Sequence, residues 1–248
     1  MKEIFKKIQS LNLRIKLAGD NGFHLIPIND CEIEKNIQLI FNQIKYAKPL
    51  GVLDVIPSLV NLLIVFDKSL TSFEKLVNEI IELLKSKSSE QNNENYLWEI
   101  PICYDDEFAK DIKEVSDICK LKPKEVCKLH FERVYSVKMM GFLPGLPFMG
   151  DLNDKLFLPR KSEPRLRVPS GSVGIAMNQT VIYPQESPGG WNLIGRIPIN
   201  IFEIRKEKSI LFTVGDKVKF NKISIKKFHK IYENNLKSPC EISNKKIM

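Results

Sequence analysis

The chain has 248 residues, enough for one large or two modest domains, each able to bury a hydrophobic core. Its 43% hydrophobic and 27% charged residues exclude an intrinsically disordered chain. The net charge of +8 would suit a polyanion, but the lysines are scattered and accompany no helix-turn-helix, zinc-finger or RNA-binding pattern. We therefore expect no nucleic-acid partner.

The segment Met1 to Ser10 alternates lysine with single apolar residues and has no continuous apolar core. It therefore predicts neither a signal peptide nor a membrane span. The five cysteines contain no CxxC pair, and an odd number leaves no closed disulfide framework. We expect a cytoplasmic protein with reduced thiols and no membrane partner.

The first third of the chain carries clear periodic patterns. Apolar residues alternate with polar ones from Leu11 to Leu17, which indicates a strand, and Gly19 to Gly22 can form a turn into a second one. Helical spacing follows, and Thr71 and Glu74 have the spacing of a capping box. The expected elements are strands at 11–17 and 23–28, a helix at 31–47, strands at 51–57 and 61–66, and a helix at 71–84. Their order is ββαββα.

A polar run from Ser86 to Asn95, SKSSEQNNEN, predicts a flexible connection. We place a domain boundary there, between residues 1–90 and 91–248. The second part begins with an extended segment and two short helices, the second starting at Pro123. Short β-branched and aromatic runs between many prolines and glycines then predict a compact β-barrel, followed by a lysine-rich tail at 221–248. The predicted class is α+β.

Three arginines lie in the proline-rich run LPRKSEPRLRVP: Arg160, Arg165 and Arg167. Guanidinium groups on a stiff backbone suit a carboxylate or a phosphate, so the run is a candidate anion site. The alternative is a set of surface ion pairs with acids such as Asp151, Asp154 and Glu163. Spacing alone favours the surface ion pairs.

Further candidates come from polar and aromatic residues near this run. Extended spacing puts Gln179 and Tyr183 on one face of a strand, where an amide and a phenol could orient a ligand with Thr180 beside them. Trp191 follows a Pro-Gly-Gly turn and could form a stacking wall, and His130 could act as a general base. The alternatives are hydrogen-bonded pairs inside a barrel, a core tryptophan and a structural histidine.

Several common site motifs are missing. The sequence has no GxxxxGK[ST] loop, no GxGxxG and no GxSxG. The three histidines are far apart and form no HExxH, so we expect no metal site. A nucleotide would need an unusual binding site.

The run GFLPGLPFMGDL, LPRKSEPRLRVPSGSVG, QT and YPQESPGGWNLIG between Gly141 and Gly195 resembles a known family. The family contains the B subunits of 5-oxoprolinases, KipI-like kinase inhibitors and the first subunits of allophanate hydrolases, and is also described as carboxyltransferase domain, subdomain C/D. The resemblance implies a two-layer α/β domain followed by a cyclophilin-like β-barrel. It also implies that His130, Arg160, Arg165, Gln179 and Tyr183 lie together.

The resemblance implies the B subunit of an ATP-dependent 5-oxoprolinase, which opens 5-oxo-L-proline to L-glutamate together with the A and C subunits. ATP, as its magnesium complex, would then be shared with a partner. The alternatives are a KipI-like inhibitor of a sensor histidine kinase and the first subunit of an allophanate hydrolase. The chain departs from the family pattern at Met177, Asn178 and Val181, where relatives carry small residues, so we expect a narrowed or reshaped site.

Overall fold

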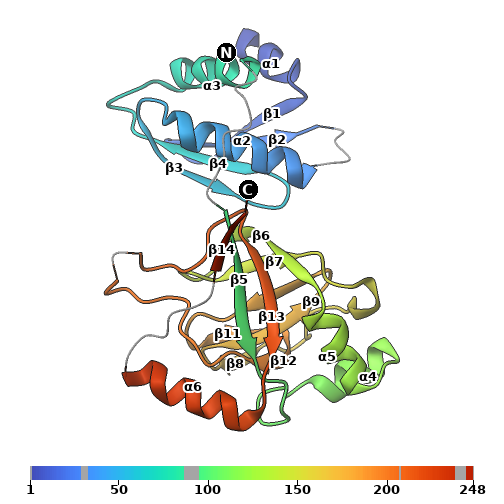
Figure 1. Cartoon of the computed structure of the whole chain (residues 1–248). Coiled ribbons are helices and arrows are strands. Elements are labelled where there is room, and N and C mark those ends of the chain that lie inside the picture. Colours follow the sequence, from blue (N-terminus) through green and yellow to red (C-terminus); the bar gives the residue numbers. More distant parts are fainter. Residues whose placement is uncertain (1, 29–32, 87–94, 207, 238–243, 248) are drawn as a thin grey trace. The chain divides into compact units, whose positions relative to one another are not determined.

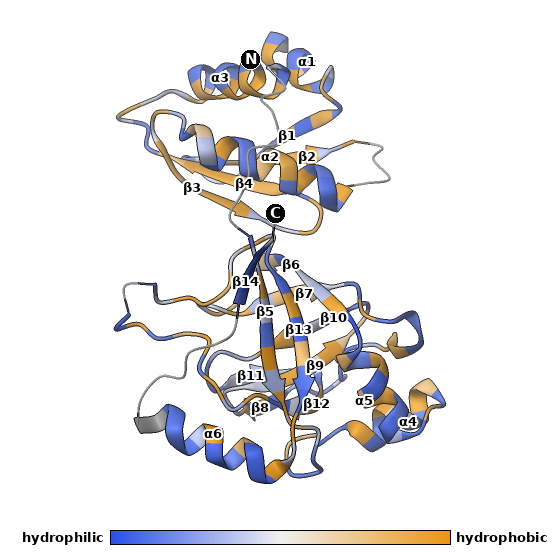
Figure 2. Ribbon diagram, in the orientation of Figure 1, coloured by the Kyte–Doolittle hydropathy of each residue, from blue (hydrophilic) through white to orange (hydrophobic). Residues whose placement is uncertain are grey.

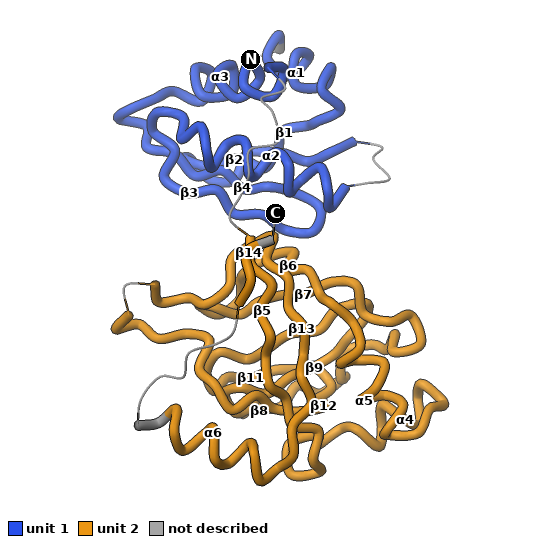
Figure 3. The backbone as a smooth tube through the Cα atoms, in the orientation of Figure 1, with its two compact units in different colours: residues 1–93 blue, residues 94–248 orange. Residues whose placement is uncertain are grey.

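The computed structural model of the chain describes residues 2–28, 33–86, 95–206, 208–237 and 244–247 (Figure 1). The chain divides into two units, Met1–Asn93 and Glu94–Met248 (Figure 3). Most of the predicted flexible connection from Ser86 to Asn95 lies outside the described residues. Within the described ranges, no helix has the length and apolar character needed to cross a membrane.

In its described residues, the first unit contains four antiparallel strands in the order β1-β2-β4-β3 and three helices. The elements are α1 (Lys2–Gln9), β1 (Leu13–Leu17), β2 (Gly22–Pro27), α2 (Ile33–Ala47), β3 (Val52–Pro57), β4 (Leu62–Phe66) and α3 (Phe73–Lys85). The predicted ββαββα succession is present from β1 to α3. It is preceded by α1, a helix that was not predicted from the sequence.

The core of this unit lies between one face of the sheet and the helices. Strand β4 is apolar throughout (Figure 2), and its alternate residues Leu62, Ile64 and Phe66 are buried. Helix α1 adds Ile4 and Ile8, one helical turn apart and both buried. The N-cap of α3 is Ser72, whose hydroxyl accepts from the Lys75 N–H at 3.2 Å, so the predicted Thr71 cap was wrong by one residue.

The second unit contains the other strands that the structure describes. Its first elements are β5 (Asn95–Ile102), α4 (Ile112–Cys119), α5 (Pro123–Phe131), β6 (Val134–Met140), β7 (Pro147–Gly150), the 3-10 helix η1 (Asp154–Leu156) and β8 (Arg165–Val168). The others are β9 (Ser172–Ala176), β10 (Gln179–Ile182), β11 (Ser187–Gly189), β12 (Asn192–Arg196), β13 (Lys217–Lys222), α6 (Ile225–Lys237) and β14 (Asn244–Ile247). Eight strands form one mixed sheet, and β8 and β11 form a separate pair.

The main sheet of the second unit is not the closed β-barrel that the short strands and turns predicted. Its strand order is β12-β9-β10-β7-β6-β13-β5-β14. The β12 and β5 segments meet at a single bridge, where Cys103 and Arg196 exchange two backbone hydrogen bonds of 2.9 Å. On its other edge, β5 pairs with β14 only from Asn95 to Trp98, so the ladder ends openly there. The mixed α and β composition is confirmed.

The sheet separates two apolar clusters. One contains residues from β5, β13, α4 and α5, and includes Ile182 of β10. The other lies on the opposite side of β10 and is completed by the β8–β11 region. Its buried members are Leu146, Phe148, Val168, Ala176, Val181, Tyr183, Trp191 and Leu193. We call this second set the outer cluster. Because strand residues alternate in direction, neighbouring positions of β10 face different clusters.

Candidate functional site

Strand β10 divides the predicted site residues into two groups. Thr180 is fully buried and faces the same cluster as Ile182, whereas Val181 and Tyr183 belong to the outer cluster. Alternation places Gln179 on the side of Val181 and Tyr183, as predicted. The predicted residues therefore do not all meet at one point.

His130, at the end of α5, lies inside the second unit with no exposed surface. Its Nδ1 lies 2.7 Å from the Tyr104 hydroxyl and its Nε2 lies 3.0 Å from the Thr180 hydroxyl. The Thr180 hydroxyl donates to the Gly174 carbonyl at 3.2 Å, so it accepts from Nε2–H, and Tyr104 donates to Nδ1. Both ring nitrogens of a neutral imidazole are satisfied.

Burial also fixes the charge of this histidine. Removal from water lowers the pKa of His130 to about 3, because the charged imidazolium is poorly solvated in the core. The ring packs against Phe220 at a centroid distance of 4.8 Å. His130 therefore stays neutral at physiological pH, and its surroundings are those of a core residue.

The outer cluster brings Arg160, Tyr183 and Trp191 together. The Arg160 guanidinium carbon stands 5.0 Å from the centroid of the Trp191 ring, a cation–π distance. Burial raises the pKa of Tyr183, while a hydrogen bond from the Trp191 backbone and the charges of Arg160 and Arg165 act against this rise. The phenol thus lies within the electrostatic reach of two arginines.

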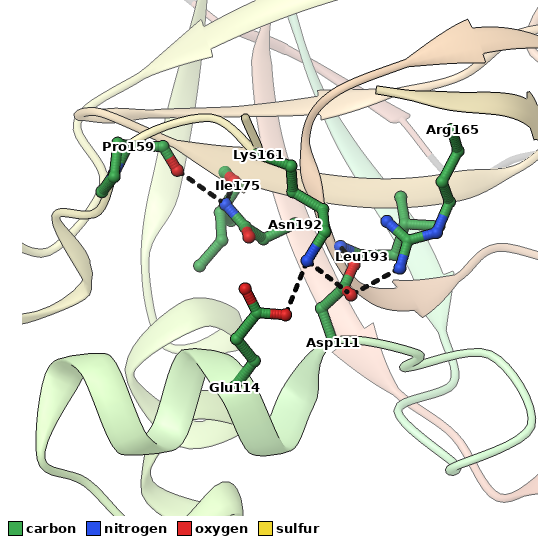
Figure 4. A network of polar contacts seen from close by, with 8 residues as sticks. All are labelled: Asp111, Glu114, Pro159, Lys161, Arg165, Ile175, Asn192 and Leu193. Atoms are coloured by element: carbon green, nitrogen blue, oxygen red, sulfur yellow. Dashed lines mark hydrogen bonds and ion pairs between the residues drawn. The ribbon is translucent and has the colours of Figure 1, made fainter. Parts of the chain in front are cut away.

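Arg165 begins β8 and is held by a carboxylate that the sequence patterns did not single out (Figure 4). Its Nη2 lies 2.5 Å from Oδ1 of Asp111, the residue before α4. Lys161 lies 3.4 Å from the same Asp111 oxygen and 2.6 Å from Oε2 of Glu114. Asp111 is only 3% exposed, so this ion pair is largely shielded from solvent.

The segment that carries Arg160 and Lys161 is fixed by Asn192. The Asn192 amide is buried and donates to the Pro159 carbonyl at 2.9 Å and to the Ile175 carbonyl at 3.1 Å (Figure 4). The Lys161 N–H donates to the Gly190 carbonyl at 2.7 Å. The two cations therefore lie on a backbone tied to the Gly-Gly-Trp turn. We call Arg160, Lys161 and Arg165 the cationic cluster.

Two buried donors of this region have no partner among the residues that the structure describes. They are Nη1 of Arg165 and Nε2 of Gln179. Buried polar groups are nearly always hydrogen-bonded, so a donor left open inside a protein is a candidate contact for a ligand oxygen. Gln179 is 8% exposed, which makes its open amide a feature of the interior rather than of the surface.

Arg167 and the unusual residues near Gln179 lie further from the cluster. Arg167 is 84% exposed and its Nε is 3.9 Å from Glu186, which fits the alternative of a surface ion pair. Met177 is half exposed in the turn between β9 and β10, and Asn178 is exposed beside it. Val181 alone of the three unusual residues is buried in the outer cluster.

The charges of this arrangement would suit an anionic ligand. Three cations with two nearby carboxylates leave a positive surplus beside an aromatic wall and an unpartnered guanidinium arm. Within the described ranges, no group of three or more His, Cys, Asp or Glu side chains is placed to hold a metal ion.

The fold and this site define a class of protein. The family model of the carboxyltransferase domain, subdomain C and D, matches residues 13–212, and the chain belongs to this family. It is 38% identical over 189 residues to the 5-oxoprolinase B subunit of Bacillus subtilis strain 168, covering 72% of this chain and 79% of that protein. It is 38% identical over 173 residues to the 5-oxoprolinase B subunit of Escherichia coli O157:H7, covering 68% of this chain and 78% of that protein.

Solved structures share the fold. The crystal structure of TTHA0988 matches with a TM-score of 0.71 and 33% identity over 82% of this chain, which spans 40% of the length of that protein. The urea amidolyase of Kluyveromyces lactis matches with a TM-score of 0.76 over 95% of this chain and 16% of that protein. At 19% identity, this second match concerns the fold alone.

Proposed function

We propose that this chain is the B subunit of an ATP-dependent 5-oxoprolinase, which opens 5-oxo-L-proline to L-glutamate with its partner A and C subunits. The identity of 37 to 38% to three 5-oxoprolinase B subunits, over 64 to 72% of this chain, carries the proposal. The family match at residues 13–212 includes the whole cationic cluster. We expect activity only in the assembled complex.

The chemistry asks for an anion site and for amide recognition. 5-Oxoproline carries a carboxylate and a lactam carbonyl, and ATP supplies the phosphoryl group that turns the amide oxygen into part of a leaving group. Arg160 and Arg165 would hold a carboxylate or a phosphate, and Gln179 and Tyr183 would orient the lactam or the nucleotide. The open donors on Arg165 and Gln179 fit acceptor oxygens of either kind.

We assign His130 a positioning role in place of the proton transfer expected from the sequence. Its ring nitrogens are both engaged, and its contact with Thr180 supports the strand that also carries Gln179. An imidazole with a pKa of about 3 is a poor proton acceptor at neutral pH. The reacting groups would then come from the other side of β10 and from partner subunits.

The proposal is tested by coexpressing this chain with homologues of the A and C subunits. We expect release of phosphate and formation of L-glutamate only when ATP, 5-oxo-L-proline and all three chains are present. The matched control omits this chain alone. Glutamate formation without this chain, or turnover of allophanate in place of 5-oxoproline, would contradict the assignment.

A further inference from the structure

The carboxylate of Asp111 is a junction between four parts of the second unit. Its Oδ1 contacts Arg165 of β8 at 2.5 Å and Lys161 at 3.4 Å. Its Oδ2 accepts from the backbone N–H of Leu193, in β12, at 2.7 Å. Asp111 itself precedes α4. One buried side chain therefore connects a helix start, an edge strand and two cations.

The backbone of Asp111 is fixed as firmly as its side chain. The Asp111 N–H donates to the Leu193 carbonyl at 2.9 Å, while the Leu193 N–H donates to the carboxylate. This reciprocal link to Leu193 leaves the second carboxylate oxygen, Oδ1, facing Arg165 and Lys161. The carboxylate cannot turn away from these cations without breaking a buried hydrogen bond.

The pairing engages only part of the guanidinium of Arg165. Nη2 is taken by Asp111, whereas Nη1 is buried and finds no partner in the described part of the protein. A guanidinium is planar and rigid, so fixing one nitrogen also fixes the direction of the other. An acceptor oxygen beside Nη1 would complete the bonding of this arginine.

The charges around Arg165 favour an anionic acceptor over a neutral one. Lys161 is shared between Glu114 and Asp111, and these contacts raise its pKa, chiefly through the hydrogen bond to Glu114. Arg160 stacks on Trp191, and in the described part of the chain no ion pair joins Arg160 to a carboxylate. The cationic cluster therefore carries one positive charge more than Asp111 and Glu114 balance.

We propose that Asp111 is the positioning residue of an oxyanion site, in which it holds one arm of Arg165 so that Nη1 binds a carboxylate or phosphate oxygen of the ligand. The naming of 5-oxoproline and adenine nucleotide as the two sources of that oxygen rests on the proposed function. The site itself follows from the contacts of Asp111, Arg165 and Lys161.

The test measures binding of three probes to the full-length chain by calorimetry: 5-oxo-L-proline, 2-pyrrolidinone, which lacks the carboxylate, and ADP. Asp111→Asn keeps an acceptor for the Leu193 N–H but removes the charge opposite Arg165. We expect it to weaken binding of one anionic probe at least tenfold and to leave 2-pyrrolidinone within twofold. Asp111→Glu should recover part of the loss. Asp117→Asn, an exposed change on the same helix, is the matched control.

The pattern of losses identifies the source of the oxygen. Weaker binding of 5-oxo-L-proline alone supports a carboxylate at Nη1, and weaker binding of ADP alone supports a phosphate. Equal losses for all three probes, no loss for either anion, or no binding of either anion by the unmodified chain would each overturn the oxyanion site. If Asp111→Asn acts as expected while the three-chain complex forms no glutamate, the proposed function fails and the site stands.

Discussion

Tyr183 and Gly189 lie so close that a Cβ added to Gly189 would stand 2.2 Å from the phenolic oxygen of Tyr183. Gly189 belongs to β11 and pairs with Arg165 of β8, so the missing side chain lets the phenol approach the backbone beside the cationic cluster. The glycine is required here for space, because any larger residue meets a buried ring.

Gly189→Ala should therefore lower the free energy of unfolding by about 2 kcal/mol, since overfilling a packed site forces side chains or backbone to move. Urea unfolding of both proteins measures the difference. Gly190→Ala is the matched control, because its added Cβ would meet its nearest atom at 3.5 Å, an ordinary contact. Equal losses for the two variants would show that the contact with Tyr183 is not responsible.

The buried His130 predicts a pH dependence of stability. In the folded chain the pKa of His130 is about 3, below the ordinary value of 6.5. Between these two pH values, His130 therefore binds a proton in the unfolded chain but not in the folded chain. The contribution of neutral His130 to the free energy of unfolding is complete above about pH 6.5. It falls as the pH drops toward 3, by up to about 1.4 kcal/mol per pH unit.

Two measurements check this prediction. NMR titration of the wild-type chain should show a neutral His130 imidazole at pH 5. Urea unfolding at pH 7 and pH 5 should show a smaller loss of stability on acidification for His130→Gln than for wild type. A His130 resonance that titrates near pH 6.5 would contradict the buried, neutral state of this ring.

Met177 is 47% exposed and has a backbone φ of 54°. This is a left-handed conformation, which glycine adopts without strain. Met177→Gly should leave the melting temperature unchanged or raise it. The free energy of unfolding should rise by up to about 1 kcal/mol. Met177→Val should lower stability by about 1 to 2 kcal/mol, because a β-branched residue fits this conformation poorly. A similar loss for both variants would contradict the role of backbone strain.

The buried amide of Asn192 holds the segment that carries Arg160 and Lys161, so a charge at this position should destabilise the protein. Its amide donates to two carbonyls, Pro159 and Ile175, and is 2% exposed. Asn192→Asp would place a buried carboxylate against these carbonyls and should lower the free energy of unfolding by about 3 kcal/mol. Asn178→Asp, in an exposed turn, is the control and should change stability by less than about 0.5 kcal/mol. Chemical unfolding of both variants gives the comparison.

Local patterns were sufficient to predict most of the first unit. The helical spacing of Ile37, Phe41 and Ile44 buries one face of α2, as expected. The alternation of Leu13 to Leu17 does form strand β1, but it buries Leu13 and leaves Leu17 exposed. Helix α1 was missed because its two buried residues, Ile4 and Ile8, are too few to stand out among lysines. Its stability comes from packing against β1 and α3, which no local pattern displays.

In the second unit, local patterns do not predict contacts between residues that are far apart in the sequence. Proline and arginine spacing pointed to Arg160 and Arg165, but Asp111 precedes Arg165 by 54 residues and only the fold brings them together. The alternation that grouped Gln179 with Tyr183 also separates Thr180 from them, a consequence that the family resemblance obscured. The open sheet likewise depends on β14, which lies far from β5 in the chain.

The central claim is that the arm of Arg165 left open by Asp111 serves the reaction of the assembled complex. Arg165→Lys keeps a positive charge near Asp111 and removes the guanidinium arm. In a complex reconstituted with the A and C subunits, we predict that kcat/KM for ATP-dependent glutamate formation falls at least about tenfold, with unchanged copurification and melting temperature. A kcat/KM within twofold of wild type would contradict this role of Arg165.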